Sequence, residues 1–157
     1  MPSQILVSIR VAATPDRAFD VFAREIGAWW RPNGLFRFTT KSPGRLEFEP
    51  GQAGRLLEIL PDGEVFEIGR ITVWEPGTKL GFTWRQESFS PEQLTQVEVR
   101  FEPVGDETRV TVQHYGWDTI PAEHVARHHF PDVIFLRRHA EWWQTLLSSY
   151  SAELLGN

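Results

Sequence analysis

The sequence has no cysteine, one methionine and only two tyrosines among its 157 residues. Without cysteine, disulfide bonds, thiolate catalysis and cysteine-ligated metals are excluded. Basic residues are also few, and the net charge of −5 argues against a nucleic-acid backbone as the main partner. No apolar run approaches the roughly 20 residues that cross a bilayer, and the N-terminus lacks the pattern of a signal peptide. We therefore expect a cytoplasmic protein that does not insert into membranes.

Aromatic residues, by contrast, are abundant, with seven Trp and 11 Phe. The apolar content of 41% and the charged content of 24% are ordinary for a globular protein. The length fits one domain, residues 1–157, which would bury about two thirds of its unfolded surface. Large rings fill cores, but they also line concave sites for apolar or aromatic ligands. We favour a pocket for a flat apolar molecule over a filled interior.

Residues 132–155 show the spacing of a long helix, with apolar side chains at steps of three and four. One stripe comprises Leu136, Ala140, Trp143, Leu147, Tyr150 and Leu154. A second stripe beside it comprises Phe135, His139, Trp142 and Leu146. We expect the first stripe to close the core and the second to border a cavity.

Upstream of this helix, alternating residues predict short strands. The expected strands are 5–11, 45–50, 55–60, 64–75, 79–86, 95–102 and 108–117. Thr14 is a good N-cap with Pro15 at the first helical position, and Gly27 is expected to end that helix before a second short turn. Gly69 indicates a bulge in the longest strand. This order of elements predicts an α+β architecture, an antiparallel sheet with helices on one side.

The order of elements, and the residues at their joints, resemble the START-like superfamily, also called Bet v 1-like, helix-grip or SRPBCC. More narrowly, the chain is similar to the bacterial branch named after the C-terminal domain of the activator of Hsp90 ATPase. The matching segments are PDRAFDVF at 15–22, WWxP at 29–32, FEPGxxGR at 48–55, DGExxxxGRIxxWEPG at 62–77, LxFTW at 80–84, VEVRFEP at 97–103 and TRVTVQHxGW at 108–117. The resemblance implies a seven-stranded antiparallel sheet wrapped around the long C-terminal helix, two short helices after the first strand, and a cavity between sheet and helix.

Members of this superfamily bind lipids, hormones, polyketides and other hydrophobic molecules, and a minority are cyclases or hydrolases. The resemblance therefore implies non-enzymatic binding, transport or sequestration of a small hydrophobic ligand, with aromatic and polyketide-like molecules as candidates. Three alternatives stay open: a polyketide cyclase or hydrolase, an Hsp90-type co-chaperone module, and an enediyne-resistance protein. The last is suggested by WWxP and the following FRFTT at 36–40. No cofactor or metal is expected, and a weak homodimer is left open.

Ten side chains are predicted to contact the ligand. They are Trp30, Phe36, Phe38, Phe48, Glu67, Trp84, His114, Phe135, His139 and Trp143. The aromatic members lie on or near elements that border the cavity in this fold. If His114 and His139 face one another across the cavity, they form a polar pair within it.

His114 follows Val110 and Val112 on the expected inner face of a strand. It is predicted to orient a ligand oxygen, to act as general base if the protein is an enzyme, or to be a structural histidine bonded to its neighbours. Glu67 would orient a ligand hydroxyl or pair with Arg55 or Arg70.

The other polar candidates favour no chemistry. Alternation leaves most of Glu47, Glu49, Glu58 and Glu67 facing water, so no pair of carboxylates for acid–base catalysis is supported. His124 and His128 are four residues apart, but no carboxylate stands at a familiar ligand spacing. We therefore expect residues 118–131 to form a solvated connection.

Overall fold

The alternating segments of the sequence form one continuous sheet in the computed structural model, which describes residues 4–33, 37–117, 120, 124, 126 and 131–156. The strands are β1 (Gln4–Val11), β2 (Arg45–Phe48), β3 (Arg55–Ile59), β4 (Val65–Glu75), β5 (Lys79–Trp84), β6 (Thr95–Val104) and β7 (Glu107–Tyr115). The helices are α1 (Pro15–Arg24), α2 (Ile26–Trp29) and α3 (Asp132–Gly156).

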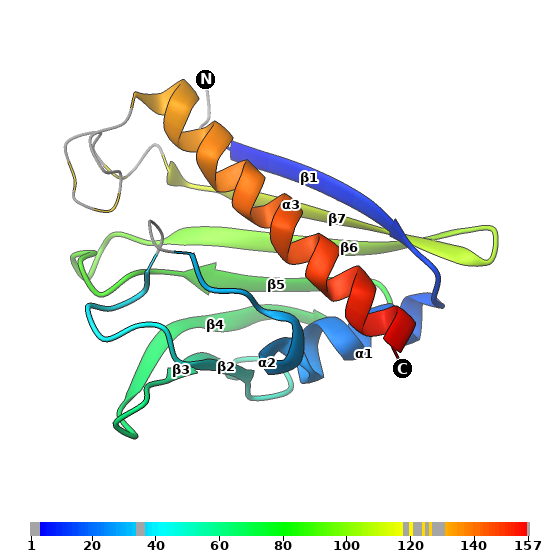
Figure 1. Cartoon of the computed structure of the whole chain (residues 1–157), viewed down its shortest axis with the longest axis horizontal. Helices are drawn as coiled ribbons and strands as arrows, with labels where there is room; N and C mark the ends of the chain where they lie inside the picture. The colour runs from blue at the N-terminus through cyan, green and yellow to red at the C-terminus, as the bar shows by residue number, and fades with distance from the viewer. Residues whose placement is uncertain are drawn as a thin grey trace.

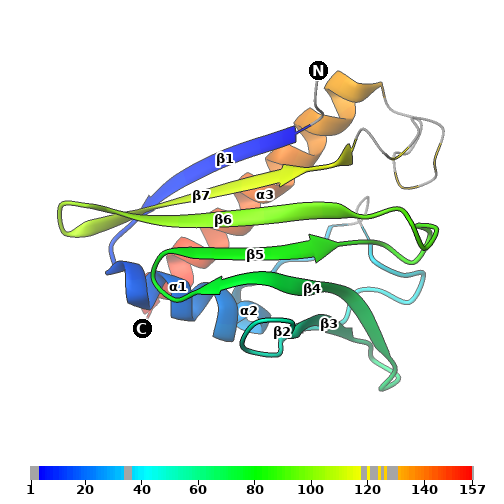
Figure 2. The same cartoon turned by 180° about the vertical axis from the view of Figure 1, so that it is seen from behind.

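The strands pair antiparallel in the order β1-β7-β6-β5-β4-β3-β2, so that the first strand joins the last. The long helix α3 crosses one face of the curved sheet (Figure 1), and the view from behind shows the other face without a covering helix (Figure 2). Helices α1 and α2 lie near the C-terminal end of α3 (Figure 1). This arrangement confirms the predicted seven-stranded α+β helix-grip fold.

The expected bulge is present at Gly69. Leu56 of β3 pairs with Gly69 of β4, but Leu57 pairs with Glu67, which leaves Ile68 as an extra residue in β4. A Cβ atom on Gly69 would collide with the carbonyl oxygen of Thr83 in β5. Glycine is required here because the two strand backbones approach too closely for a side chain.

The start of α1 was predicted correctly, but its end was not. The Thr14 side chain accepts a hydrogen bond from the Arg17 backbone N–H at 3.2 Å, as an N-cap does. The helix ends at Arg24, and Gly27 lies inside α2 rather than at a helix end. A Cβ on Gly27 would lie 2.9 Å from the Leu46 carbonyl oxygen. The glycine therefore allows α2 to approach β2, and it does not terminate a helix.

Side chains of α3 enter the core in a different pattern from the one predicted. Phe135 and His139, assigned to the cavity edge, are fully buried, whereas Leu136 and Ala140 of the expected core stripe are only partly buried. Farther along, the two stripes merge into one buried face. Its residues are Trp142, Trp143, Leu146, Leu147, Tyr150 and Leu154. The first half of α3 is thus rotated so that the second stripe meets the sheet.

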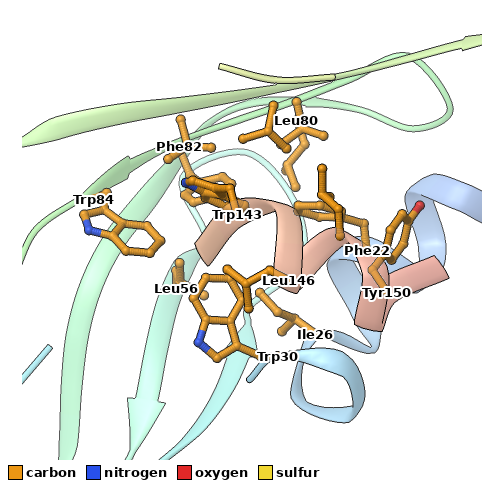
Figure 3. Packing of buried hydrophobic residues seen from close by; sticks show 14 of the residues in the cluster. Phe22, Ile26, Trp30, Leu56, Leu80, Phe82, Trp84, Trp143, Leu146 and Tyr150 are labelled. Atoms are coloured by element: carbon orange, nitrogen blue, oxygen red, sulfur yellow. The ribbon is translucent and has the colours of Figure 1, made fainter. Parts of the chain in front are cut away.

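The interior between α3 and the sheet is rich in rings. Trp143 and Leu146 project from α3 among side chains of the sheet and of the α1–α2 region (Figure 3). Two hydrogen bonds fix the helix to that region: Tyr150 donates to the Ala18 carbonyl and Ser149 to the Trp29 carbonyl, each at 2.6 Å. Among the described helices, none combines the length and the apolar character needed to cross a membrane.

Candidate functional site

A cavity of about 240 Å³ lies between α3, β2, β3 and the segment that follows α2. Its lining residues are Trp30, Pro32, Asn33, Arg37, Phe38, Ser42, Pro43, Gly44, Leu46, Glu58 and Trp142. Pro32, Arg37 and Pro43 are exposed, so the cavity opens at the protein surface. At about 30 Å³ per water molecule, this volume corresponds to roughly eight waters, just below the roughly 300–1,000 Å³ of typical ligand pockets.

Aromatic rings form one side of the cavity. Trp30 is the central ring, with its centroid 6.3 Å from that of Phe38 and 5.5 Å from that of Trp142. The Trp142 indole N–H donates to the Arg31 carbonyl at 3.0 Å, which ties α3 to the segment after α2. All three rings are at least nine-tenths buried, so their positions are set by packing before any ligand arrives.

A buried carboxylate stands on the polar side. Glu58 of β3 is only 2% exposed. Its Oε1 accepts a hydrogen bond from the Ser42 hydroxyl at 2.6 Å, and its Oε2 accepts one from the Gly44 backbone N–H at 2.9 Å. A Cβ on Gly44 would collide with the carbonyl oxygen of Ile59. The glycine therefore allows the backbone to approach β3 closely enough for its N–H to reach the carboxylate.

Of the nine predicted ligand contacts that the structure describes, two, Trp30 and Phe38, line this cavity. Six others belong to the packed interior: Phe48, Trp84, His114, Phe135, His139 and Trp143. Phe36 lies outside the described residues. The chamber expected between the sheet and the middle of α3 is filled by these rings, and the cavity is displaced toward β2 and β3. In this part of the fold the described rings pack against one another, and the preference for a pocket stays a prediction that concerns the cavity beside β2 and β3.

His114 is a structural histidine with both ring nitrogens engaged. Its Nδ1 accepts from the Trp143 indole N–H at 3.2 Å, and because an indole only donates, the proton of the neutral imidazole resides on Nε2. Nε2 lies 2.7 Å from the Thr95 hydroxyl, which donates in turn to the Trp84 carbonyl at 3.2 Å. Burial, with a smaller contribution from His139, holds the pKa of His114 well below its usual value. A neutral, fully buried ring does not reach the described cavity.

His139 does face His114, with ring centroids 5.1 Å apart. Its ring also lies 5.1 Å from that of Trp117 and 5.4 Å from that of Trp142, so it occupies an aromatic cage. Burial lowers the pKa of His139 to about 3. The predicted pair exists, but it is part of the core and does not line the described cavity.

Glu67 is on the outside of the sheet and not in the interior. It forms an ion pair with Arg70 at 3.2 Å, and the two side chains are 39% and 60% exposed. The bulge beside it breaks the alternation on which its expected position depended. Arg55, the other proposed partner, instead forms a two-pronged pair with Glu49, whose pKa is lowered to about 2 by hydrogen bonds from that guanidinium.

In the described part of the 118–131 connection, both ring nitrogens of His124 have hydrogen-bond partners. His124 accepts from the Ala126 N–H through Nδ1 at 3.0 Å, and its Nε2 lies 3.1 Å from the Ser88 carbonyl oxygen, so both nitrogens are occupied. His128 lies outside the described residues. Within the described residues, no group of three or more candidate ligands comes together.

Glu58 and Ser42 are the functional candidates that the sequence reasoning missed. Glu58 was grouped with carboxylates expected mostly to face water. The signal that could have found it is strict alternation: Leu56, Glu58 and Leu60 share one face of a strand, and both leucines are core residues. Ser42 had no such signal, because it lies in a segment without regular structure.

The curved sheet that grips a long C-terminal helix defines the START-like class. Within that class, the model of the family described as activator of Hsp90 ATPase homolog 1-like protein matches residues 12–150. The chain therefore belongs to this family, as the sequence motifs indicated. No curated protein matches the sequence.

Solved structures share the same fold. A protein of Mesorhizobium loti is 16% identical with a TM-score of 0.66, and the match covers 98% of this chain and 96% of that one. An Hsp90 activator of Plasmodium falciparum is 19% identical with a TM-score of 0.63, covering 97% and 96%. An anthrahydroquino-γ-pyrone synthase, solved in complex with a compound designated SUM, is 30% identical with a TM-score of 0.52, covering 86% and 87%.

Proposed function

We propose that this protein binds a small, flat, mostly apolar molecule in the cavity lined by Trp30, Phe38 and Trp142. The observation that carries the proposal is the cavity itself: about 240 Å³ with an aromatic side, a buried carboxylate and an opening at the surface. Small-molecule sites combine apolar walls with a few placed polar groups in this way. The ligand class agrees with the 30% identical relative, an anthrahydroquino-γ-pyrone synthase.

Binding is favoured over the enzymatic alternative in which His114 acts as a base. That histidine has both nitrogens engaged, is fully buried, and is not among the residues that line the cavity. A general base must come within hydrogen-bond reach of the proton it removes. The co-chaperone alternative rests on the family name, and a weak homodimer stays a prediction.

Apolar burial sets the expected affinity. A bicyclic aromatic probe that buries roughly 200 Å² would gain about 5 kcal/mol before binding entropy is subtracted. This corresponds to a Kd on the order of 0.2 mM at best. A naphthalene derivative is therefore a suitable probe, since millimolar and submillimolar binding is measurable by NMR titration.

The test is a titration of 2-naphthol into the wild type and into Leu46→Phe, with Leu6→Phe as the matched control. Leu46 is buried and lines the cavity, whereas Leu6 is 63% exposed on β1. We expect the Trp30 and Trp142 indole N–H resonances to shift on binding. The added ring at position 46 should weaken binding at least tenfold, and the ring at position 6 should not. Equal binding by all three proteins would place the ligand elsewhere and overturn the proposal.

A further inference from the structure

We infer that Glu58 binds a neutral hydroxyl group of the ligand, so that the cavity selects hydroxylated aromatic molecules over their hydrocarbon and ether analogues. This inference rests on the proposed function, because it names the ligand class for the same cavity. It adds a polar requirement that the aromatic wall alone does not impose.

Glu58 has acceptor capacity for a ligand donor. A carboxylate offers about four lone-pair positions on its two oxygens. Ser42 and Gly44 each donate one hydrogen bond, one to each oxygen. With the donors among the described residues counted, two positions remain for a further donor, and the residue lines the cavity.

The charge of the buried Glu58 carboxylate also favours a ligand that donates a hydrogen bond. Among the described residues, no Lys or Arg nitrogen lies within 4.0 Å of the Glu58 carboxylate. A carboxylate that is 2% exposed loses most of its hydration and needs donors in compensation. Neutral donors from Ser42 and Gly44 supply part of this compensation. A ligand hydroxyl in the cavity would supply a third hydrogen bond of the stronger, charge-assisted kind.

The donor group of the ligand could be a hydroxyl or an ammonium group, and the charges around the cavity favour the hydroxyl. A protonated amine would also satisfy Glu58, and Trp30 and Trp142 offer aromatic faces that attract cations. However, Arg37 stands exposed among the lining residues, so the cavity already holds a positive charge near its opening. Like charges in one small site repel, whereas a neutral hydroxyl meets no such repulsion. A phenol-type ligand with its hydroxyl toward Glu58 satisfies the carboxylate and brings no positive charge close to Arg37.

The experiment compares three probes with the same naphthalene ring at pH 7: 2-naphthol, 2-methoxynaphthalene and 2-naphthylmethylamine. In the wild type, we expect 2-naphthol to bind at least tenfold more tightly than 2-methoxynaphthalene, which keeps the oxygen but has no proton to donate. A hydrogen bond to a charged acceptor is strong enough to produce a tenfold ratio. A ratio below threefold would overturn the inference, and so would tighter binding of the protonated amine than of the phenol.

A variant then assigns the selectivity to one side chain. In Glu58→Gln the ratio should fall below threefold, and in Glu47→Gln, an exposed carboxylate on the neighbouring strand, it should stay unchanged. Persistence of the ratio in Glu58→Gln would contradict the role of Glu58. The wild-type ratio keeps the test decisive even if Glu58→Gln folds poorly. If no probe binds, or if Leu46→Phe binds all of them normally, the proposed function itself fails.

Discussion

Acid should destabilise this protein through its buried histidines, and His139 gives the clearest measurement. The pKa of His139 is about 3 in the folded protein and 6.5 without burial. Above pH 6.5 both the folded and the unfolded states are neutral at this residue. Below pH 6.5 His139 binds a proton in the unfolded state but stays neutral in the folded state. The free energy of unfolding therefore falls as the pH falls.

The expected loss of stability follows from the pKa values of His139 in the folded and unfolded states. Each pH unit below 6.5 and above the folded pKa costs 1.36 kcal/mol, so His139 should remove about 2 kcal/mol of stability between pH 7 and pH 5. His114 acts in the same direction, because its pKa is also lowered by burial. For a domain with a total stability of about 5–15 kcal/mol, such a loss is large.

The perturbation is His139→Phe, with urea unfolding measured at pH 7 and pH 5. The substitution removes the titrating group and keeps an aromatic ring, although overpacking should cost about 1–3 kcal/mol at both pH values. The difference in unfolding free energy between pH 7 and pH 5 should shrink by about 2 kcal/mol relative to the wild type.

The control is Phe135→Leu, which alters the same ring cluster without removing a titrating group. It should lower stability by a similar amount at both pH values and leave the pH dependence unchanged. If His139→Phe retains the full wild-type pH dependence, then His139 is not kept neutral by burial, and the reasoning fails.

Two further predictions concern positions fixed by the sheet. Thr95→Val removes the hydroxyl that lies between the His114 Nε2–H and the Trp84 carbonyl. The buried Nε2–H group is then left without an acceptor, which should lower the free energy of unfolding in urea by about 1–3 kcal/mol. The control Thr111→Val removes an exposed hydroxyl and should change the free energy of unfolding by less than about 0.5 kcal/mol. Gly69→Ala should lower the melting temperature by several degrees or prevent folding, because its Cβ would meet the carbonyl of the adjacent strand, while Gly156→Ala at the open end of α3 should be tolerated. A stable Gly69→Ala protein, or equal effects of the two threonine changes, would contradict these contacts.

Local patterns in the sequence were sufficient to place the strands, the start of α1 and the long helix α3. Alternation in residues 95–102 and 108–117 predicted β6 and β7, and the Thr14–Pro15 pair predicted the start of α1. These signals work because they depend on neighbours within a few residues along the chain. The family motifs then implied that the seven strands form one antiparallel sheet around the C-terminal helix, which the alternation could not give by itself, and the order of the strands came from the structure.

Predictions failed where distant segments decide the outcome. Gly27 reads as a helix end, but it permits α2 to approach β2, which lies about twenty residues farther along the chain. The rotation of α3 likewise depends on which rings the sheet presents, so two equally apolar stripes could not be ranked from spacing alone. Glu67 was misplaced because the bulge beside it reverses the alternation.

The sequence by itself determined that this chain folds as a sheet around one long helix, that it carries an excess of rings, and that it uses no cysteine chemistry. Tertiary structure alone decided where those rings leave space. His114 was the most prominent polar candidate in the sequence, yet packing engages both of its nitrogens in the core. Glu58 had been grouped with carboxylates expected mostly to face water, yet Ser42 and Gly44, contributed by a segment without regular structure, hold it at a cavity. A cavity exists only where side chains from separate elements do not pack against one another, so a local sequence pattern cannot predict its position.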